Sequence, residues 1–180
     1  MLILSVLLSG CSAEDAALKQ GMTFRSNLLS AEGCRFGASI TADYGDELYA
    51  FSMECQADAS GNLTFSLTQP EALSGISGTV SDEGGRITFE DTALTFPLLT
   101  DDQLSPASAP WIFVKTLRSG YLTSACMEDG MLRLSMDDTY EEEALHLDIW
   151  MDENRMPVCG DILYDGRRIL SVEVEDFTFL

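Results

Sequence analysis

The sequence predicts an α+β fold, in which one large curved antiparallel sheet carries one or two helices on its concave face. Most of the chain after residue 33 alternates apolar and polar side chains with a period of two, which is typical of strands with one buried face. Turns rich in Gly, Asp and Asn separate these strands. Only two segments have helical spacing, too few for the crossover helices that parallel strands require.

The first eleven residues form an apolar run that ends in Leu8-Ser9-Gly10-Cys11, the pattern of a bacterial lipobox. The run is too short to span a bilayer, which takes about 20 apolar residues, but it fits the apolar part of an export signal. In a lipobox the cysteine after the cut carries diacylglycerol on its thiol. We therefore expect residues 1–10 to be a signal peptide and lipidated Cys11 to hold the protein at the extracytoplasmic face of the cell membrane.

A short buried helix and an ordinary cleaved signal are the alternatives for this segment. The run has no polar face, which makes it a poor amphipathic helix, and Gly10-Cys11 stands where the polar residues begin. Both observations favour the lipoprotein signal. Such signals usually open with Lys or Arg, which this run lacks, so we expect its native start to lie upstream or to have been trimmed.

The charge balance limits the partners of the chain. It has 10 basic and 30 acidic side chains, a formal net charge of −20. Nucleic acid is excluded, because phosphate binding needs a basic face. An anionic membrane surface repels such a body, so attachment must come from the lipid. Solubility explains the acidity, and attraction of cationic ligands is the less common alternative.

Residues 12–32 are expected to form a helix that ends at Gly33, with a tether as the alternative for part of the stretch. We divide the chain into the signal at 1–10, the lipid-anchored tether and helix at 11–32, and a single sheet domain at 33–180. The apolar residues at roughly helical spacing are Leu18, Met22, Phe24, Leu28 and Leu29.

Residues 34–42 and 47–55 are expected to pair as a hairpin with one buried face. A two-residue loop at Tyr44-Gly45 sets Cys34 directly opposite Cys55. That pairing brings the Cα atoms to about 4.5 Å, the short end of disulfide geometry.

A loop at Gly45-Asp46 instead moves the register by two residues and makes Cys34 and Cys55 diagonal neighbours. We expect a Cys34–Cys55 disulfide, with two buried free thiols as the alternative. The remaining pair, Cys126 and Cys159, has two predicted strands between its members, so no bond is expected. The cysteines lack zinc-type spacing, which excludes a thiolate metal site.

The middle of the chain contains a second helical pattern. Trp111, Val114 and Leu117 share one stripe, and Pro110 stands where a first turn tolerates it. Packing in the core is the expected role of this helix, and a membrane-dipping segment is the alternative. Before it, we expect strands at residues 63–68, 78–81 and 86–96.

The last third predicts five more strands. Pairing Leu134 with Leu147 sets Arg133 against Asp148 on the outer face, where such an ion pair contributes about 0.2–1 kcal/mol. The expected strands are residues 121–127, 131–137, 144–151, 156–164 and 168–179.

In these features the chain resembles the LolA/LppX-like superfamily of bacterial envelope proteins. The resemblance is carried by the lipobox Leu8–Cys11, the meandering strands, the helix at Trp111–Leu117 and the closing segment from Leu147 to Phe179. It implies a half-barrel with helices as a lid and a greasy concavity able to hold acyl chains. It carries over no particular binding residue.

Catalysis and cofactors are not predicted. His146 shares a face with Asp148, but no nucleophile elbow accompanies them, so a surface histidine is expected and a hydrolase is improbable. The acidic residues at 137–138 and 141–143 lack the ligand spacing of a calcium loop, so they are interpreted as a solvated turn and no metal is expected.

We therefore expect a non-enzymatic lipoprotein whose curved sheet binds a hydrophobic molecule or a lipidated protein. The alternative is a tethered protein–protein interaction module with a filled core and no ligand cavity. The residues expected to line the concave ligand site are Phe36, Phe51, Met53, Phe65, Trp111, Leu134 and Leu147.

Overall fold

A computed structural model describes residues 10–100, 103–140 and 144–180 of the chain. Within these residues eleven strands form one sheet, and two short strands, β7 (Leu99–Thr100) and β8 (Gln103–Leu104), pair separately. The strands of the large sheet are β1 (Gly33–Asp43), β2 (Leu48–Asp58), β3 (Leu63–Gln69), β4 (Ser77–Ser81), β5 (Gly84–Phe89), β6 (Thr92–Phe96), β9 (Tyr121–Glu128), β10 (Met131–Asp137), β11 (His146–Met151), β12 (Pro157–Tyr164) and β13 (Arg167–Phe179).

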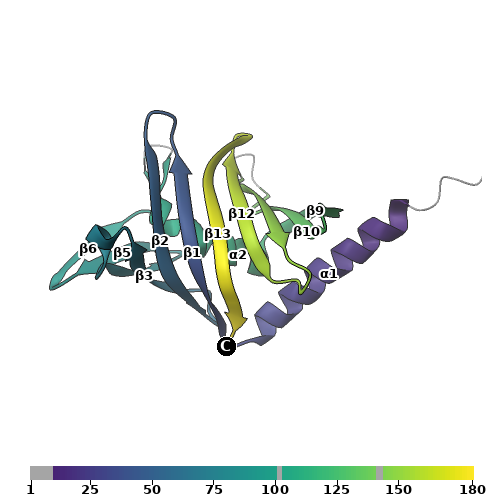
Figure 1. The fold of residues 1–180 in the computed structure, drawn as a ribbon, viewed down its shortest axis with the longest axis horizontal. Coiled ribbons are helices and arrows are strands. Elements are labelled where there is room, and N and C mark those ends of the chain that lie inside the picture. Colours follow the sequence, from purple (N-terminus) through teal and green to yellow (C-terminus); the bar gives the residue numbers. More distant parts are fainter. Residues whose placement is uncertain (1–9, 101–102, 141–143) are drawn as a thin grey trace, which may run out of the picture.

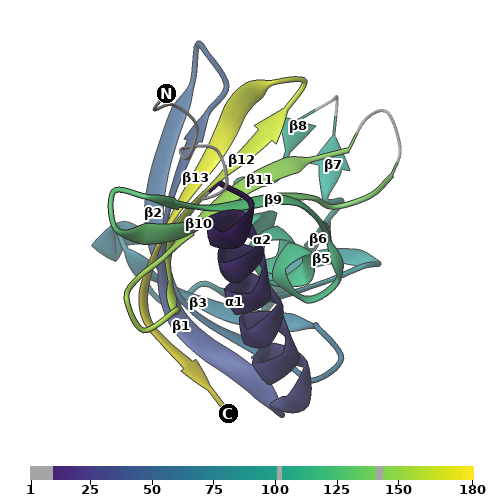
Figure 2. The ribbon, with the colours of Figure 1, turned by 90° about the vertical axis from the view of Figure 1, so that its right-hand side faces the viewer.

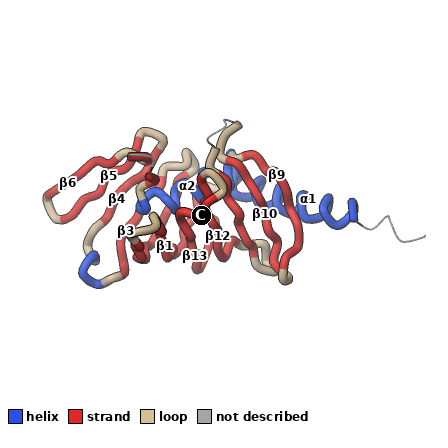
Figure 3. Tube along the Cα trace, turned by 90° about the horizontal axis from the view of Figure 1, so that it is seen from above, coloured by secondary structure: helices blue, strands red, loops and turns tan. Residues whose placement is uncertain are grey.

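The large sheet is antiparallel, with the order β6-β5-β4-β3-β2-β1-β13-β12-β11-β10-β9. β1 and β13, the first and last strands in the sequence, pair near the middle of the sheet (Figure 1). A meander of strands extends from them to either side. Seen from above, the sheet bends into an open arch, with α2 inside it and α1 extending past β9 and β10 (Figure 3). The predicted α+β fold, a half-barrel with helices on its concave face, is therefore confirmed.

The second helix, α2 (Ala109–Ser119), packs in the core as predicted, directly after the 3-10 turn η2 (Pro106–Ser108). It lies in the arch and is buried on nearly every side, so its apolar surface is wider than one stripe. Phe113 at its centre is fully buried and fits against Gly160, where an added Cβ would lie 2.7 Å from the ring. The Trp111 indole donates to the Gly61 carbonyl (3.0 Å), which fixes the helix to the β2–β3 turn.

The first helix, α1 (Gly10–Ser30), runs along the other side of the concave face, against β9 and β10 (Figure 2). The predicted apolar stripe is only partly right, because Leu18, Met22 and Leu29 are exposed. The stripe that faces the sheet starts at Ala17, one residue before the predicted Leu18. It contains Gly21, whose lack of a side chain lets Leu134 pack against the helix. It comprises Ala17, Gly21, Phe24 and Leu28.

Two predicted segments fall partly outside the described residues, namely residues 1–9 of the expected signal peptide and residues 141–143 of the acidic turn. Cys11 belongs to α1, but its side chain is not among those described. Of the helices in the described ranges, none is both long and apolar enough to cross a membrane.

The β1–β2 hairpin has the second of the two registers considered from the sequence. The Tyr44 N–H donates to the Glu47 carbonyl (3.0 Å), so the loop is Gly45-Asp46. Gly45 has a φ of 91°, whereas a Tyr44-Gly45 loop would force a tyrosine into the positive-φ position of the turn.

The expected Cys34–Cys55 pairing is therefore wrong by two residues. Cys34 pairs with Ala57 and Cys55 with Phe36, so the cysteines are diagonal neighbours. Both are buried free thiols, in place of the expected disulfide. Burial raises the pKa of the Cys34 thiol to about 11, and it raises the pKa of Cys55 as well, so both side chains stay protonated at neutral pH.

The predicted register of β10 with β11 is also displaced by two residues, since Leu134 lies opposite Ile149 and Ser135 opposite Asp148. The predicted ion pair nevertheless forms along the diagonal, with Arg133 Nη2 2.7 Å from Asp148 Oδ2. Because a long arginine side chain reaches diagonal neighbours, this charge pair is compatible with more than one register.

The expected strand at residues 86–96 is two strands. β5 and β6 form a hairpin through Glu90-Asp91, with Phe89 opposite Thr92. Glu90 takes a positive φ of 50°, a conformation that a glycine in the sequence would have indicated. The extra hairpin makes β6 the edge of the sheet.

Candidate functional site

The candidate site is a cavity on the part of the concave face that α1 and α2 leave uncovered. The helices pack against β9, β10, β12, β13, β1 and β2, whereas the sheet continues beyond them through β3 to β6 (Figures 1 and 3). There the strands and the segment that follows β6 border an open cavity of about 520 Å³. We call this space the concave-face cavity.

The strands form the walls of the cavity because their side chains alternate between the two faces of the sheet. Side chains two residues apart on one strand point to the same face, and the concave faces of β2, β3, β5 and β6 contribute lining residues. The strand lining consists of Tyr49 and Phe51 from β2, Phe65 and Leu67 from β3, Ile87 from β5 and Phe96 from β6.

The segment after β6 closes the opposite wall. Pro97 and residues 104–107, which span β8 and η2, line the cavity from this side. The Tyr44 hydroxyl, at the end of the β1–β2 hairpin, donates to the Leu104 carbonyl and links the two walls. Burial, with a smaller contribution from neighbouring Tyr49, raises the pKa of Tyr44 to about 12, so it remains a neutral donor.

Exposure distinguishes the floor of the cavity from its mouth. Phe65 is only 3% exposed and Leu104 7%, whereas Tyr49 is 45% exposed. At this open end the Tyr49 hydroxyl donates to the carboxylate of Glu47, and that hydrogen bond raises the pKa of Tyr49. The cavity therefore combines an apolar interior with a polar, acidic rim.

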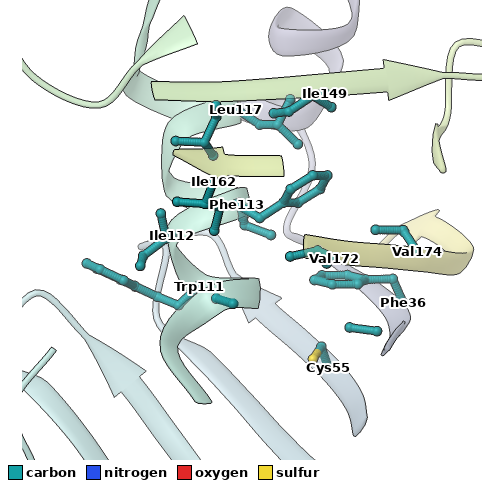
Figure 4. Close-up of a cluster of buried hydrophobic side chains, with 14 of the residues drawn as sticks. Phe36, Cys55, Trp111, Ile112, Phe113, Leu117, Ile149, Ile162, Val172 and Val174 are labelled. Carbon is teal, nitrogen blue, oxygen red and sulfur yellow. The ribbon is translucent and has the colours of Figure 1, made fainter. Parts of the chain in front are cut away.

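The predicted ligand-lining residues separate into two groups. Phe51 and Phe65 line the concave-face cavity. Phe36, Met53 and Trp111 belong to the packed core, which Figure 4 shows around Phe36, Trp111 and Phe113.

Two more predicted residues also lie away from the cavity. Leu147 is fully buried in the core, and Leu134 packs against Gly21 of α1. The remaining lining residues were not predicted from the sequence. The alternation of apolar residues in β3 and β5 already contained a signal for Leu67 and Ile87, whereas nothing local indicated that residues 104–107 form a wall.

The outer face of the sheet carries a polar network around Asp148. The Ser135 hydroxyl donates to Asp148 Oδ1 (2.6 Å), and His146 Nδ1 lies 2.7 Å from Asp137 Oδ1. Burial opposes ionisation of Asp148, but hydrogen bonds from Arg133 and Ser135 outweigh it and lower its pKa. The serine bonds to a carboxylate and not to the imidazole, so the network lacks the geometry of a nucleophile and its base.

The other predictions about chemistry concern the cysteines and metals. Cys126 on β9 and Cys159 on β12 have two strands between them, as expected, and both are free thiols. Across the described ranges, no cluster of three His, Cys, Asp or Glu side chains has the arrangement that would hold a metal ion.

No protein-family model and no curated protein matches this sequence. Similar solved structures include an uncharacterised conserved protein from Thermus thermophilus, with a TM-score of 0.47 and 10% identity over 92% of this chain and 86% of that one. A LolA superfamily protein from Nitrosomonas europaea has a TM-score of 0.46 and 7% identity, over 93% and 94% of the two chains. The lipoprotein LppX from Mycobacterium tuberculosis has a TM-score of 0.43 and 12% identity, over 90% and 93%. Each of these likenesses concerns the backbone fold alone.

Proposed function

We propose that the protein is a lipid-anchored extracytoplasmic lipoprotein that binds an apolar molecule in the concave-face cavity. The occupant is a hydrophobic small molecule or the acyl chains of a lipidated protein. The cavity itself carries this proposal, because its volume of about 520 Å³ suits a ligand and its lining is mainly aliphatic and aromatic. Transfer of apolar ligand surface from water into such a lining is favourable by about 25 cal/mol per Å².

The lipobox supports the proposed location. Residues 1–10 are the proposed signal, 11–32 the anchored tether and helix, and 33–180 the binding domain. Acyl chains on Cys11 would hold the protein at the extracytoplasmic face of the cell membrane, where its net charge of −20 keeps the domain away from anionic headgroups.

A binding role, not a catalytic one, accounts for the lining. Among its described residues the groups that titrate are Tyr44, Glu47 and Tyr49, and both tyrosine hydroxyls are engaged as donors. The alternative of an interaction module with a filled core is less favoured, because it calls for a packed concave face where the structure has an open volume.

Filling the cavity tests the proposal. Leu67 is half-buried on the cavity wall, so Leu67→Trp places an indole where the ligand would lie. The free volume makes the larger side chain tolerable, with a change in unfolding free energy within about 1 kcal/mol. We expect the purified variant to take up the uncharged fluorescent probe N-phenylnaphthylamine at least about tenfold more weakly than the wild type, a loss of roughly 1.4 kcal/mol.

The neighbouring residue of the same strand provides the control. Ser66 is exposed on the opposite face of β3, so Ser66→Trp adds the same indole outside the cavity and should leave probe uptake unchanged. Equal uptake by the two tryptophan variants, or no uptake by the wild type, would contradict the proposal.

A further inference from the structure

Two tyrosines and a carboxylate stand together at the mouth of the concave-face cavity. The rings of Tyr44 and Tyr49 meet edge to face, with centroids 6.2 Å apart and planes at 61°. Glu47 lies between them in the chain and accepts the Tyr49 hydroxyl. Both Glu47 and Tyr49 are exposed, so this group forms part of the rim and is accessible from solvent.

The charge of the mouth is one-sided. Glu47 is the single charged side chain among the described residues that line the cavity. Arg167 lies beside the same turn, but it pairs with Asp43 (3.7 Å) and is not part of the lining. The net charge of −20 adds a negative field around the whole chain. An anionic head group at this mouth would face a carboxylate without a cation to balance it.

Aromatic faces beside a carboxylate are suited to bind an ammonium ion. A cation over a tyrosine ring is attracted by the ring quadrupole, and quaternary ammonium groups are recognised in this way by aromatic side chains. Phe51 follows Tyr49 on the same face of β2, about 7 Å further along the strand. A chain attached to an ammonium at the mouth would thus pass from polar rim to apolar floor.

We infer that the Tyr44–Glu47–Tyr49 mouth selects apolar ligands whose chain ends in an alkylammonium group. This inference rests on the proposed function, because it assigns the head group of the molecule that the cavity binds. The chain lies along Phe51 towards Phe65, and the ammonium group stays at the rim beside the carboxylate of Glu47.

Three amphiphiles of equal chain length test the inference on the full chain. The assay measures displacement of N-phenylnaphthylamine from the purified protein by each amphiphile, below its micelle concentration. The amphiphiles are dodecyltrimethylammonium, uncharged monolaurin and laurate. We expect the cation to displace the probe at about tenfold lower concentration than monolaurin, and laurate to be the weakest of the three.

Two variants with the same change in net charge separate the mouth from the general field. In Glu47→Gln the preference for the cation over monolaurin should fall to about threefold or less. Glu54 is exposed on the opposite face of β2, so Glu54→Gln should keep the full preference. In Glu54→Gln the affinity for monolaurin should stay unchanged as well.

The outcomes are distinct. Equal displacement by the cation and monolaurin, tighter binding of laurate, or equal effects of the two variants would overturn the inference while leaving the binding function intact. Failure of all three amphiphiles to displace the probe, together with failure of the probe to bind, would overturn both the inference and the proposed function.

Discussion

Replacement of Phe113 by alanine is expected to lower the free energy of unfolding by about 3–5 kcal/mol. The ring is fully buried at the centre of α2, where it contacts the sheet through Gly160. Its removal leaves a void that the surrounding strands can close only in part. Thermal and urea unfolding followed by circular dichroism measure the change. Ser119→Ala, at an exposed position of the same helix, should change stability by less than about 0.5 kcal/mol.

The same contact predicts a coupling between Phe113 and Gly160. A Cβ at residue 160 would lie 2.7 Å from the ring, so Gly160→Ala should destabilise the wild type. In the Phe113→Ala background most of that clash is absent, and Gly160→Ala should cost clearly less. Additive effects of the two substitutions, or a loss below about 1 kcal/mol for Phe113→Ala, would mean that α2 does not pack as described.

Replacement of Cys11 by serine is expected to abolish membrane attachment in the native host. The wild type should incorporate labelled palmitate and partition into the detergent phase, because each buried methylene of an acyl chain contributes about 0.8 kcal/mol. Serine cannot take the thioether-linked lipid. The acidic body supplies no substitute, since its net charge of −20 disfavours an anionic surface.

Ser12→Ala is the matched control for this prediction. This substitution is of similar size and lies at the neighbouring position, so the variant should keep both the palmitate label and the partitioning into the detergent phase. Persistence of Cys11→Ser in the membrane fraction, or absence of palmitate from the wild type, would show that the apolar N-terminal run acts in another way.

Most strands were predictable from the sequence because they have one buried face. Alternation located β10 at residues 131–137 and identified the first hairpin, and the helical stripe located α2. These patterns depend on local periodicity, which follows directly from which side of an element faces the core.

Register and turn position were less predictable. A shift of two residues keeps every side chain on the same face, so the apolar pattern cannot distinguish Cys34 opposite Cys55 from Cys34 opposite Ala57. The turn decides, and here the need for glycine at a positive φ selected Gly45-Asp46. At Glu90 a non-glycine residue takes that conformation, so the break in the predicted strand had no sequence signal.

The candidate site was predictable only in part, for a related reason. Alternation places Phe51, Phe65, Leu134 and Leu147 on concave strand faces alike. Whether such a face lines a cavity or a packed core depends on where the helices lie, and that is a tertiary property. α1 covers Leu134, whereas Phe51 and Phe65 lie beyond both helices.

Mass spectrometry of the protein released from its host membranes, under native and then denaturing conditions, tests the central claim most directly. The account predicts an apolar molecule whose mass is present in the native spectrum and lost on denaturation, which distinguishes it from lipid on Cys11. The Leu67→Trp variant should lack that mass, and Ser66→Trp should retain it. A wild-type protein that is free of bound mass, and that takes up no amphiphile when one is supplied, would contradict the account.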